Sequence, residues 1–92
     1  MSVSKIELSE KLDQRSLQSL FLNLKAAAGQ PVELGTSQVR HLGGQCAQVL
    51  VAAVRKWGAD GIELSFEETE SFVSIVRNLG LEDEIFLKGS ER

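Results

Sequence analysis

The apolar positions of the chain follow two spacings, one typical of strands and one typical of helices. In KIEL, residues 5–8, polar and apolar residues alternate, so Ile6 and Leu8 share one face of a predicted strand. PVEL, residues 31–34, and GIELSF, residues 61–66, predict two further strands. A longer segment with helical spacing follows each strand.

The first helical segment carries apolar residues at i, i+3, i+4 and i+7, which predicts an amphipathic helix. Asp13 is a candidate cap at its start. Gly29 can adopt the left-handed conformation that ends a helix, and Pro31 prevents continuation. The core-facing positions expected here are Leu17, Leu20, Phe21 and Leu24.

The third helical segment has the same spacing, and Gly80 closes it. Ser65 and Glu68 have capping-box spacing, but Ser71 directly precedes the periodic run and is the preferred start. The segment at residues 84–88 is too short to distinguish a strand from a helical turn. The core-facing positions expected in this helix are Phe72, Ile75, Val76 and Leu79.

The second helix is predicted from Gly44 to Trp57, with a stop at Gly58, and its apolar arc is unusually wide. A central helix flanked by two others explains this width best, and contact of part of the arc with another protein is the alternative. Gln45, Gln48, Arg55 and Lys56 are expected to face water. The arc consists of Cys46, Ala47, Val49, Leu50, Val51, Ala53, Val54 and Trp57.

Strands that alternate with helices predict crossover connections, and therefore an α/β fold with a mostly parallel sheet. With so few strands, the helices are expected mainly on one face. Residues 1–92 are the length of a single domain.

Composition narrows the possible functions. The net charge of −3 and the lack of any Lys/Arg cluster argue against nucleic-acid binding. No apolar run reaches the roughly 18 residues of a membrane span, and MSVSKIELSE lacks the apolar core of a signal peptide. Cys46 is the only cysteine, so an intramolecular disulfide is impossible. These features favour a cytoplasmic protein.

Few side chains are candidates for chemistry. Cys46 lies on the apolar arc, which favours a packed side chain over a reactive thiolate. His41 is the only histidine, so it is a poor metal ligand and more typical of a surface loop. Trp57 is expected to cover the core rather than anchor a partner, and the acidic run at residues 67–70 to be a solvated loop. We therefore predict no enzyme activity, no cofactor and no metal.

Two glycines, Gly43 and Gly44, stand where a strand turns into the second helix. Free amide groups at such a turn can bind phosphate, but GGQC lacks the further glycines, Lys and Ser/Thr of phosphate loops. A tight turn with close backbone approach is the commoner explanation. The other explanation is that the glycines leave this surface without side chains so that a partner protein can approach it.

The run from residue 31 to residue 81 resembles a STAS domain, the family of anti-sigma factor antagonists and of sulfate-transporter tails. Its Val-x-Leu strand, its Ser37 and Val39, its corner at residues 42–46 and its terminal Leu-Gly-Leu at 79–81 follow the family pattern in order and spacing. The resemblance implies a mixed, mostly parallel sheet. The chain is most similar in its corner to small stand-alone STAS proteins with a Gly-Gly-x-Cys corner, which are associated with bacterial chemotaxis.

The corner also departs from the family. In phosphorylated members a corner serine accepts phosphate from a kinase, and the alignment places Gln45 at that position. Gln45 has no hydroxyl, so this position is not phosphorylatable. Gly43 replaces the usual corner aspartate, Cys46 the usual glycine, and Gly35 an earlier aspartate.

The resemblance implies a non-catalytic bacterial signalling module that binds a partner protein, either a chemotaxis kinase or an anti-sigma-type regulator. Two alternatives from the same family are a soluble subunit of a lipid ABC transporter and a domain that binds a small ligand. We expect the partner to contact a corner surface formed by His41, Gly43, Gly44, Gln45 and Gln48.

Overall fold

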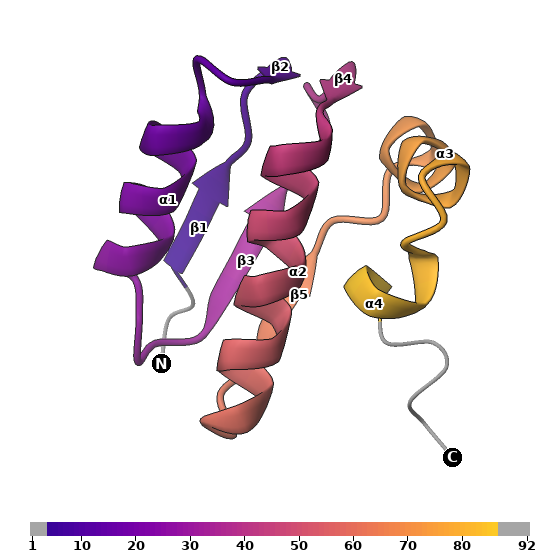
Figure 1. Ribbon diagram of the computed structural model, residues 1–92. Helices are drawn as coiled ribbons and strands as arrows, with labels where there is room; N and C mark the ends of the chain where they lie inside the picture. The colour runs from indigo at the N-terminus through magenta and orange to yellow at the C-terminus, as the bar shows by residue number, and fades with distance from the viewer. Residues whose placement is uncertain (1–3, 87–92) are drawn as a thin grey trace.

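The computed structural model describes residues 4–86, in which strands and helices alternate (Figure 1). The predicted order of strand, helix, strand, helix, strand and helix is confirmed, with two short strands added. The elements are β1 (Ser4–Glu7), β2 (Lys11–Leu12), α1 (Leu17–Ala26), β3 (Val32–Gly35), β4 (His41–Leu42), α2 (Gly44–Ala59), β5 (Leu64–Phe66), α3 (Glu70–Asn78) and α4 (Glu82–Phe86).

The main sheet has three strands in the order β1-β3-β5, and both pairings are parallel. The register aligns Ile6 with Leu34 and Leu34 with Phe66. Because residues in register share a face, these three side chains form one apolar row across the sheet. The predicted α/β fold with a mostly parallel sheet is therefore confirmed.

The two faces of this sheet differ sharply. On one face α1 and α2 lie side by side over the strands, and α4 and α3 continue this layer beyond α2 (Figure 1). The opposite face carries Lys5, Glu7 and Glu33, and the Lys5 Nζ pairs with Glu7 Oε2 at 3.5 Å. Helices therefore cover one face, and the other is polar and open to water.

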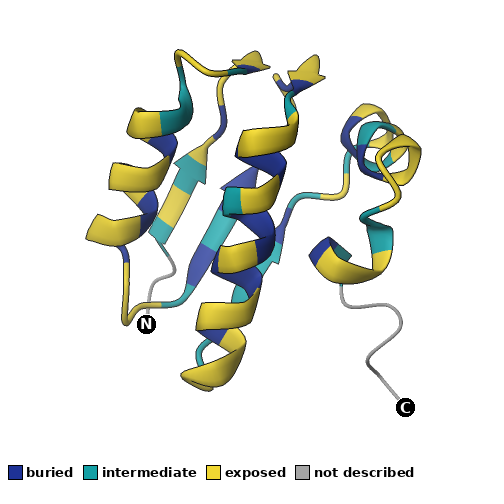
Figure 2. Cartoon of the chain, viewed as in Figure 1, coloured by how far each residue is buried: buried dark blue, intermediate teal, exposed yellow. Residues whose placement is uncertain are grey.

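The core lies between the helices and the covered face of the sheet, as the dark-blue stripe along α2 shows (Figure 2). Of the predicted apolar arc of α2, only Val49 is not fully buried. The width of the arc therefore comes from the central position of α2 in the helical layer. The largest fully buried side chains of the core are Phe72, Leu12, Leu34 and Leu50.

Two predicted helix starts are wrong. Ser16 is the N-cap residue of α1, and Asp13 instead accepts a hydrogen bond from the backbone N–H of Arg15 in the preceding turn, at 3.0 Å. Thr69, not Ser71, is the N-cap residue of α3. In neither helix does the N-cap side chain hydrogen-bond to a first-turn N–H group. The Ser16 hydroxyl donates to the Lys11 carbonyl at 2.8 Å, and the Thr69 hydroxyl contacts the Thr36 hydroxyl at 2.8 Å.

The C-terminus of α2 also differs from its prediction. The helix continues through Gly58 to Ala59, and Gly61, with φ of 70°, adopts the left-handed conformation after it. The backbone N–H of Ile62 donates to the Trp57 carbonyl at 3.0 Å, as in a Schellman motif. Because this turn occupies residues 60–62, β5 begins only at Leu64 rather than at Gly61.

The predicted end at Gly80 is confirmed, since Gly80 follows the C-cap residue of α3 with φ of 74°. Gly29 also has positive φ, 86°, but α1 already ends at Ala26, so Gly29 belongs to the turn after the helix and does not end it. The undecided piece at residues 84–88 is helical as far as Phe86, and its last two residues lie outside the described range.

Two residues predicted to face the core are exposed. Phe21 is 52% exposed because α1 directs Leu20 and Leu24 inward, which leaves Phe21 on the flank of the helix. Leu79 is 42% exposed because it is the C-cap residue of α3, after which the chain turns and packs Leu81 against the core instead.

Candidate functional site

The corner before α2 is held in place by a two-stranded parallel pairing that the sequence pattern did not predict. In this pairing β2 and β4 align Lys11 with His41 and Leu12 with Leu42. Leu12 and Leu42 are both buried, which anchors the two strands to the core. Two residues are too few for a recognisable alternation, so hydrophobic periodicity could not identify these strands.

Gly43 connects β4 to α2 and approaches the neighbouring strand closely. Its backbone N–H donates to the Leu12 carbonyl at 2.7 Å. A Cβ atom at Gly43 would lie only 3.3 Å from the same oxygen, although φ of −76° suits any residue. Close backbone approach, and not positive φ, therefore favours glycine here, as one of the predicted explanations requires.

Gly44 differs from its neighbour. It is exposed, is the first residue of α2, and has no atom within 4 Å of the position a Cβ would occupy. It is also absent from the residues with positive φ. Neither packing nor backbone conformation in the described structure requires glycine at this position, so Gly44 leaves an exposed helix start without side-chain bulk.

The remaining three predicted corner-surface residues lie on the same short stretch. His41 is exposed on β4, and its Nε2 lies 3.9 Å from the ideal Cβ position of Gly43. Gln45 and Gln48 are exposed, and their spacing of three places them on one side of α2. Within residues 4–86 no hydrogen bond involves any of these three side chains.

The five predicted residues thus lie within residues 41–48 around the start of α2, where Gly43 is half-buried and the other four are exposed. The first-turn N–H groups of α2 have no side-chain cap, because Gly43 offers none. The corner surface holds uncharged hydrogen-bonding groups and one imidazole.

Cys46 lies behind the corner surface and is 1% exposed. Its Sγ donates to the Asp13 carbonyl at 3.3 Å. Burial raises the pKa of the Cys46 thiol, and the nearby Asp13 carboxylate raises it further. The prediction of a packed side chain is therefore confirmed.

Trp57, at the other end of α2, is 4% exposed, and its Nε1–H donates to the Gln30 carbonyl at 2.7 Å. The prediction that Trp57 covers the core is confirmed, because its ring is buried and its N–H group has a hydrogen-bond partner within the chain.

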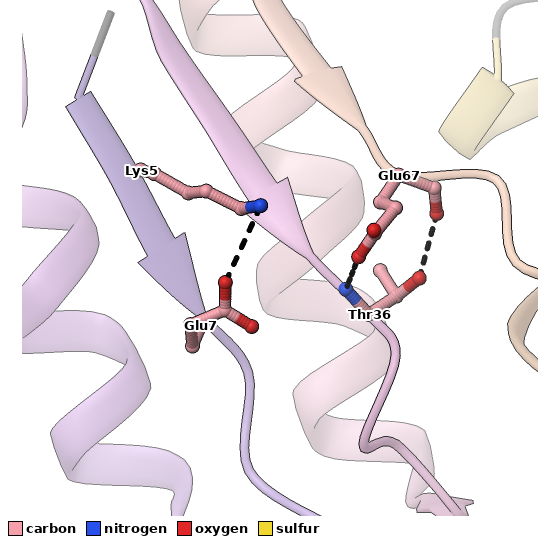
Figure 3. Close-up of polar contacts among 4 residues, drawn as sticks. All are labelled: Lys5, Glu7, Thr36 and Glu67. Atoms are coloured by element: carbon pink, nitrogen blue, oxygen red, sulfur yellow. Dashed lines mark hydrogen bonds and ion pairs between the residues drawn. The ribbon is translucent and has the colours of Figure 1, made fainter.

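A buried polar cluster that the sequence reasoning missed joins β3 to the start of α3 (Figure 3). Thr36 is fully buried, and its hydroxyl lies 2.6 Å from the Glu67 carbonyl and 2.8 Å from the Thr69 hydroxyl. The Thr36 N–H donates to Glu67 Oε1 at 3.0 Å. Glu67 is therefore a structural residue, and not part of the solvated loop predicted at 67–70.

A signal for this cluster was present in the sequence. Thr36 and Glu67 each come directly after a strand, and adjacent parallel strands end at the same edge of a sheet.

The position of Gly35, where the STAS pattern has an aspartate, has a local explanation. A Cβ atom at Gly35 would lie 2.6 Å from Glu7 Oε1, on the open face of the sheet. A carboxylate at position 35 would therefore lie against the Glu7 carboxylate, and like charges at this distance repel. The same Glu7, with Glu33 and Glu67, raises the pKa of Lys5.

Among residues 4–86 no three His, Cys, Asp or Glu side chains are placed to hold a metal ion. In the same range no helix has the length and apolar character needed to cross a bilayer.

Comparison with known proteins adds no relative to this description. No family model matches the sequence, and no curated protein is significantly similar to it. The resemblance to STAS domains therefore stays a prediction that depends on the residues at 31–81.

Proposed function

We propose that this chain is a non-catalytic signalling module that binds a partner protein through the corner surface. Two observations at one place carry the proposal. Gly44 is exposed and has no side chain, and the β2–β4 pairing holds the backbone of the corner beside it. A partner can approach the start of α2 closely without displacing a side chain. Because β2 and β4 already hold the backbone in place, little conformational entropy is lost on binding.

The polar composition of the corner surface supports a protein partner. Gln45 and Gln48 offer donors and acceptors without a charge that must be desolvated. Protein interfaces commonly combine such adaptable groups with close main-chain approach.

We assign the partner to the class that the STAS resemblance implies, a bacterial signalling protein such as a chemotaxis kinase or an anti-sigma-type regulator. Binding there proceeds without a covalent switch, since Gln45 occupies the phosphoacceptor-equivalent position. Thr36 cannot substitute for it, because its hydroxyl is buried and hydrogen-bonded. After incubation with ATP and bacterial serine kinases, the intact mass of the protein is expected to show no added phosphate, because neither position offers an accessible hydroxyl.

Site-specific photo-crosslinking tests the proposal. A photoreactive amino acid at Gln48, on the corner surface, is expected to trap one partner in the native cells. The matched control places the same amino acid at Ala59, which is exposed at the opposite end of the same helix. A signalling protein trapped from Gln48 and not from Ala59 supports the proposal, and a transporter ATPase would assign the chain to the lipid-transport alternative. Equal trapping from both positions contradicts the proposal.

A further inference from the structure

A second surface, distinct from the corner surface, lies between α1 and α2. It is an apolar groove of about 300 Å³ that extends from Val49, in the first half of α2, to Trp57 near its C-terminus. Its walls include Phe21 and Lys25 from α1, and Val49, Ala52, Lys56 and Trp57 from α2. The two helices that form its walls lie side by side (Figure 1).

The exposed apolar surface continues beyond the groove. Phe21, which lines the groove, is 52% exposed, and its neighbour Leu22, outside the lining, is 53% exposed. The groove and Leu22 together form a larger apolar strip than the groove alone. Large contiguous apolar patches on a protein surface commonly mark interaction sites.

The charged side chains that line the groove, Lys25 and Lys56, are both positive. Neither α1 nor α2 contains an Asp or Glu, although the chain has 13 acidic residues. The nearest acidic partner is Asp60, which follows α2 and lies outside the lining. The walls of the groove therefore carry positive charge in a protein of net charge −3.

The two groove lysines are available for new partners. Lys56 Nζ pairs with Asp60 Oδ2 at 3.3 Å, but both side chains are largely exposed, so the pair is weak and easily exchanged. Lys25 Nζ lies 5.9 Å from the centre of the Phe21 ring, which positions the ammonium group beside the apolar strip.

From this combination we propose that the groove binds an acidic amphipathic helix of a partner protein. A helix of this kind inserts its apolar residues into a groove between two helices. Its Glu and Asp residues, along the flanks of that apolar face, pair with Lys25 and Lys56. A helix also covers Leu22, which lies outside the lining and which a small ligand confined to the groove leaves exposed.

Two labelled synthetic peptides test the proposal by fluorescence anisotropy. Both are about 18 residues long, enough for helix formation, and share an apolar Leu/Ala face. One carries Glu on the flanks of that face, and the other carries Lys. We expect the Glu peptide to bind at least about tenfold more tightly at low salt, with the preference weakening as salt is added.

Charge reversal provides the decisive variant. The double variant Lys25→Glu/Lys56→Glu is expected to prefer the Lys peptide. The matched control is Lys11→Glu/Arg40→Glu, which changes the net charge by the same amount. Both of its residues lie outside α1 and α2, so this control should still prefer the Glu peptide. Thermal melts verify that each variant folds. If the charge-reversed variant unfolds, Lys25→Gln/Lys56→Gln replaces it. This neutral variant should bind the two peptides equally.

A groove-filling variant tests the location. Ala52→Trp is expected to abolish binding of the Glu peptide, and Ala26→Trp, on an exposed position of α1 outside the groove lining, should leave it intact. Equal affinity for the two peptides, no saturable binding of either, or a preference unchanged by charge reversal overturns the proposal. Saturable binding of decanoate without peptide binding also overturns it, and assigns the groove to an acyl chain.

Discussion

At the scale of single residues, the two adjacent glycines of the corner have different roles. Gly43 approaches the Leu12 carbonyl so closely that a Cβ atom would lie 3.3 Å from it. Gly44 has open space around it and an ordinary helical backbone. The sequence shows only a Gly-Gly pair, so this difference could not be predicted from it.

Alanine substitution should separate the two glycines. Gly44→Ala is expected to raise the free energy of unfolding by about 0.4–1 kcal/mol, because alanine reduces the entropy of the unfolded chain and fits the folded one. Gly43→Ala should be less stable than Gly44→Ala by about 1 kcal/mol, because the added methyl group presses on a backbone oxygen. Urea denaturation of both variants measures this, and equal midpoints contradict the assignment of close approach to Gly43.

The apolar residues of the helical stripes also divide by position. Leu50 is fully buried at the centre of α2, whereas Leu79 is 42% exposed at the end of α3. Periodicity assigned both to the core, because the i, i+3, i+4, i+7 pattern does not show where a stripe extends beyond its neighbours.

Leu50→Ala is accordingly expected to destabilise the protein by about 2–5 kcal/mol, as is usual for a buried leucine. Leu79→Ala should change the free energy of unfolding by no more than about 0.5 kcal/mol, as at exposed sites. Chemical denaturation compares the two variants. A large loss in Leu79→Ala would mean that the end of α3 packs more tightly than its exposure indicates.

At the scale of elements, the main strands and helices could be predicted because each has a long periodic pattern. Their ends could not be predicted reliably, since Asp13, Ser16, Ser71 and Thr69 are all competent caps and only the folded structure selects among them. Gly58 and Gly61 likewise compete to end α2. The short β2–β4 pairing carries almost no local signal and depends on contacts between distant residues.

Two of the contacts that link β3 to the start of α3 are made by one hydroxyl group, that of Thr36. Thr36→Val keeps the shape of the side chain but leaves the Glu67 carbonyl and the Thr69 hydroxyl without their buried partner. We expect a loss of about 1–3 kcal/mol in the free energy of unfolding.

Thr36→Ser retains the hydroxyl and serves as the matched control, with a smaller loss. Hydrogen exchange of the amides at the start of α3 should increase in Thr36→Val and less so in Thr36→Ser. If both variants exchange alike, the hydroxyl contacts do not hold α3 in place.

At the scale of the whole molecule, the two proposed surfaces follow one another along α2 and differ in chemistry. The corner surface offers glutamine amides and open backbone, whereas the groove offers carbon atoms beside lysines. Because α2 is the central helix of the layer, it is part of both. One chain of this size can therefore contact two partner elements without a conformational change.

Binding at the corner surface is the central claim, and a matched pair of glycine substitutions on α2 tests it. Gly44 and Gly58 both have open space at the Cβ position, and neither has positive φ. Gly44→Asp adds bulk and charge at the corner, where aspartate suits the N-terminus of a helix. Gly58→Asp adds the same group at the far end of α2. Thermal melts establish that both variants fold.

The direct measurement is the affinity of the partner trapped from Gln48 for wild-type protein and for the two variants, by isothermal titration calorimetry. We predict at least about a tenfold loss of affinity for Gly44→Asp, on the order of 1.4 kcal/mol, because a charge becomes buried in the interface. Gly58→Asp should bind like the wild type. Wild-type affinity in Gly44→Asp would contradict the account and place the interface elsewhere on the molecule.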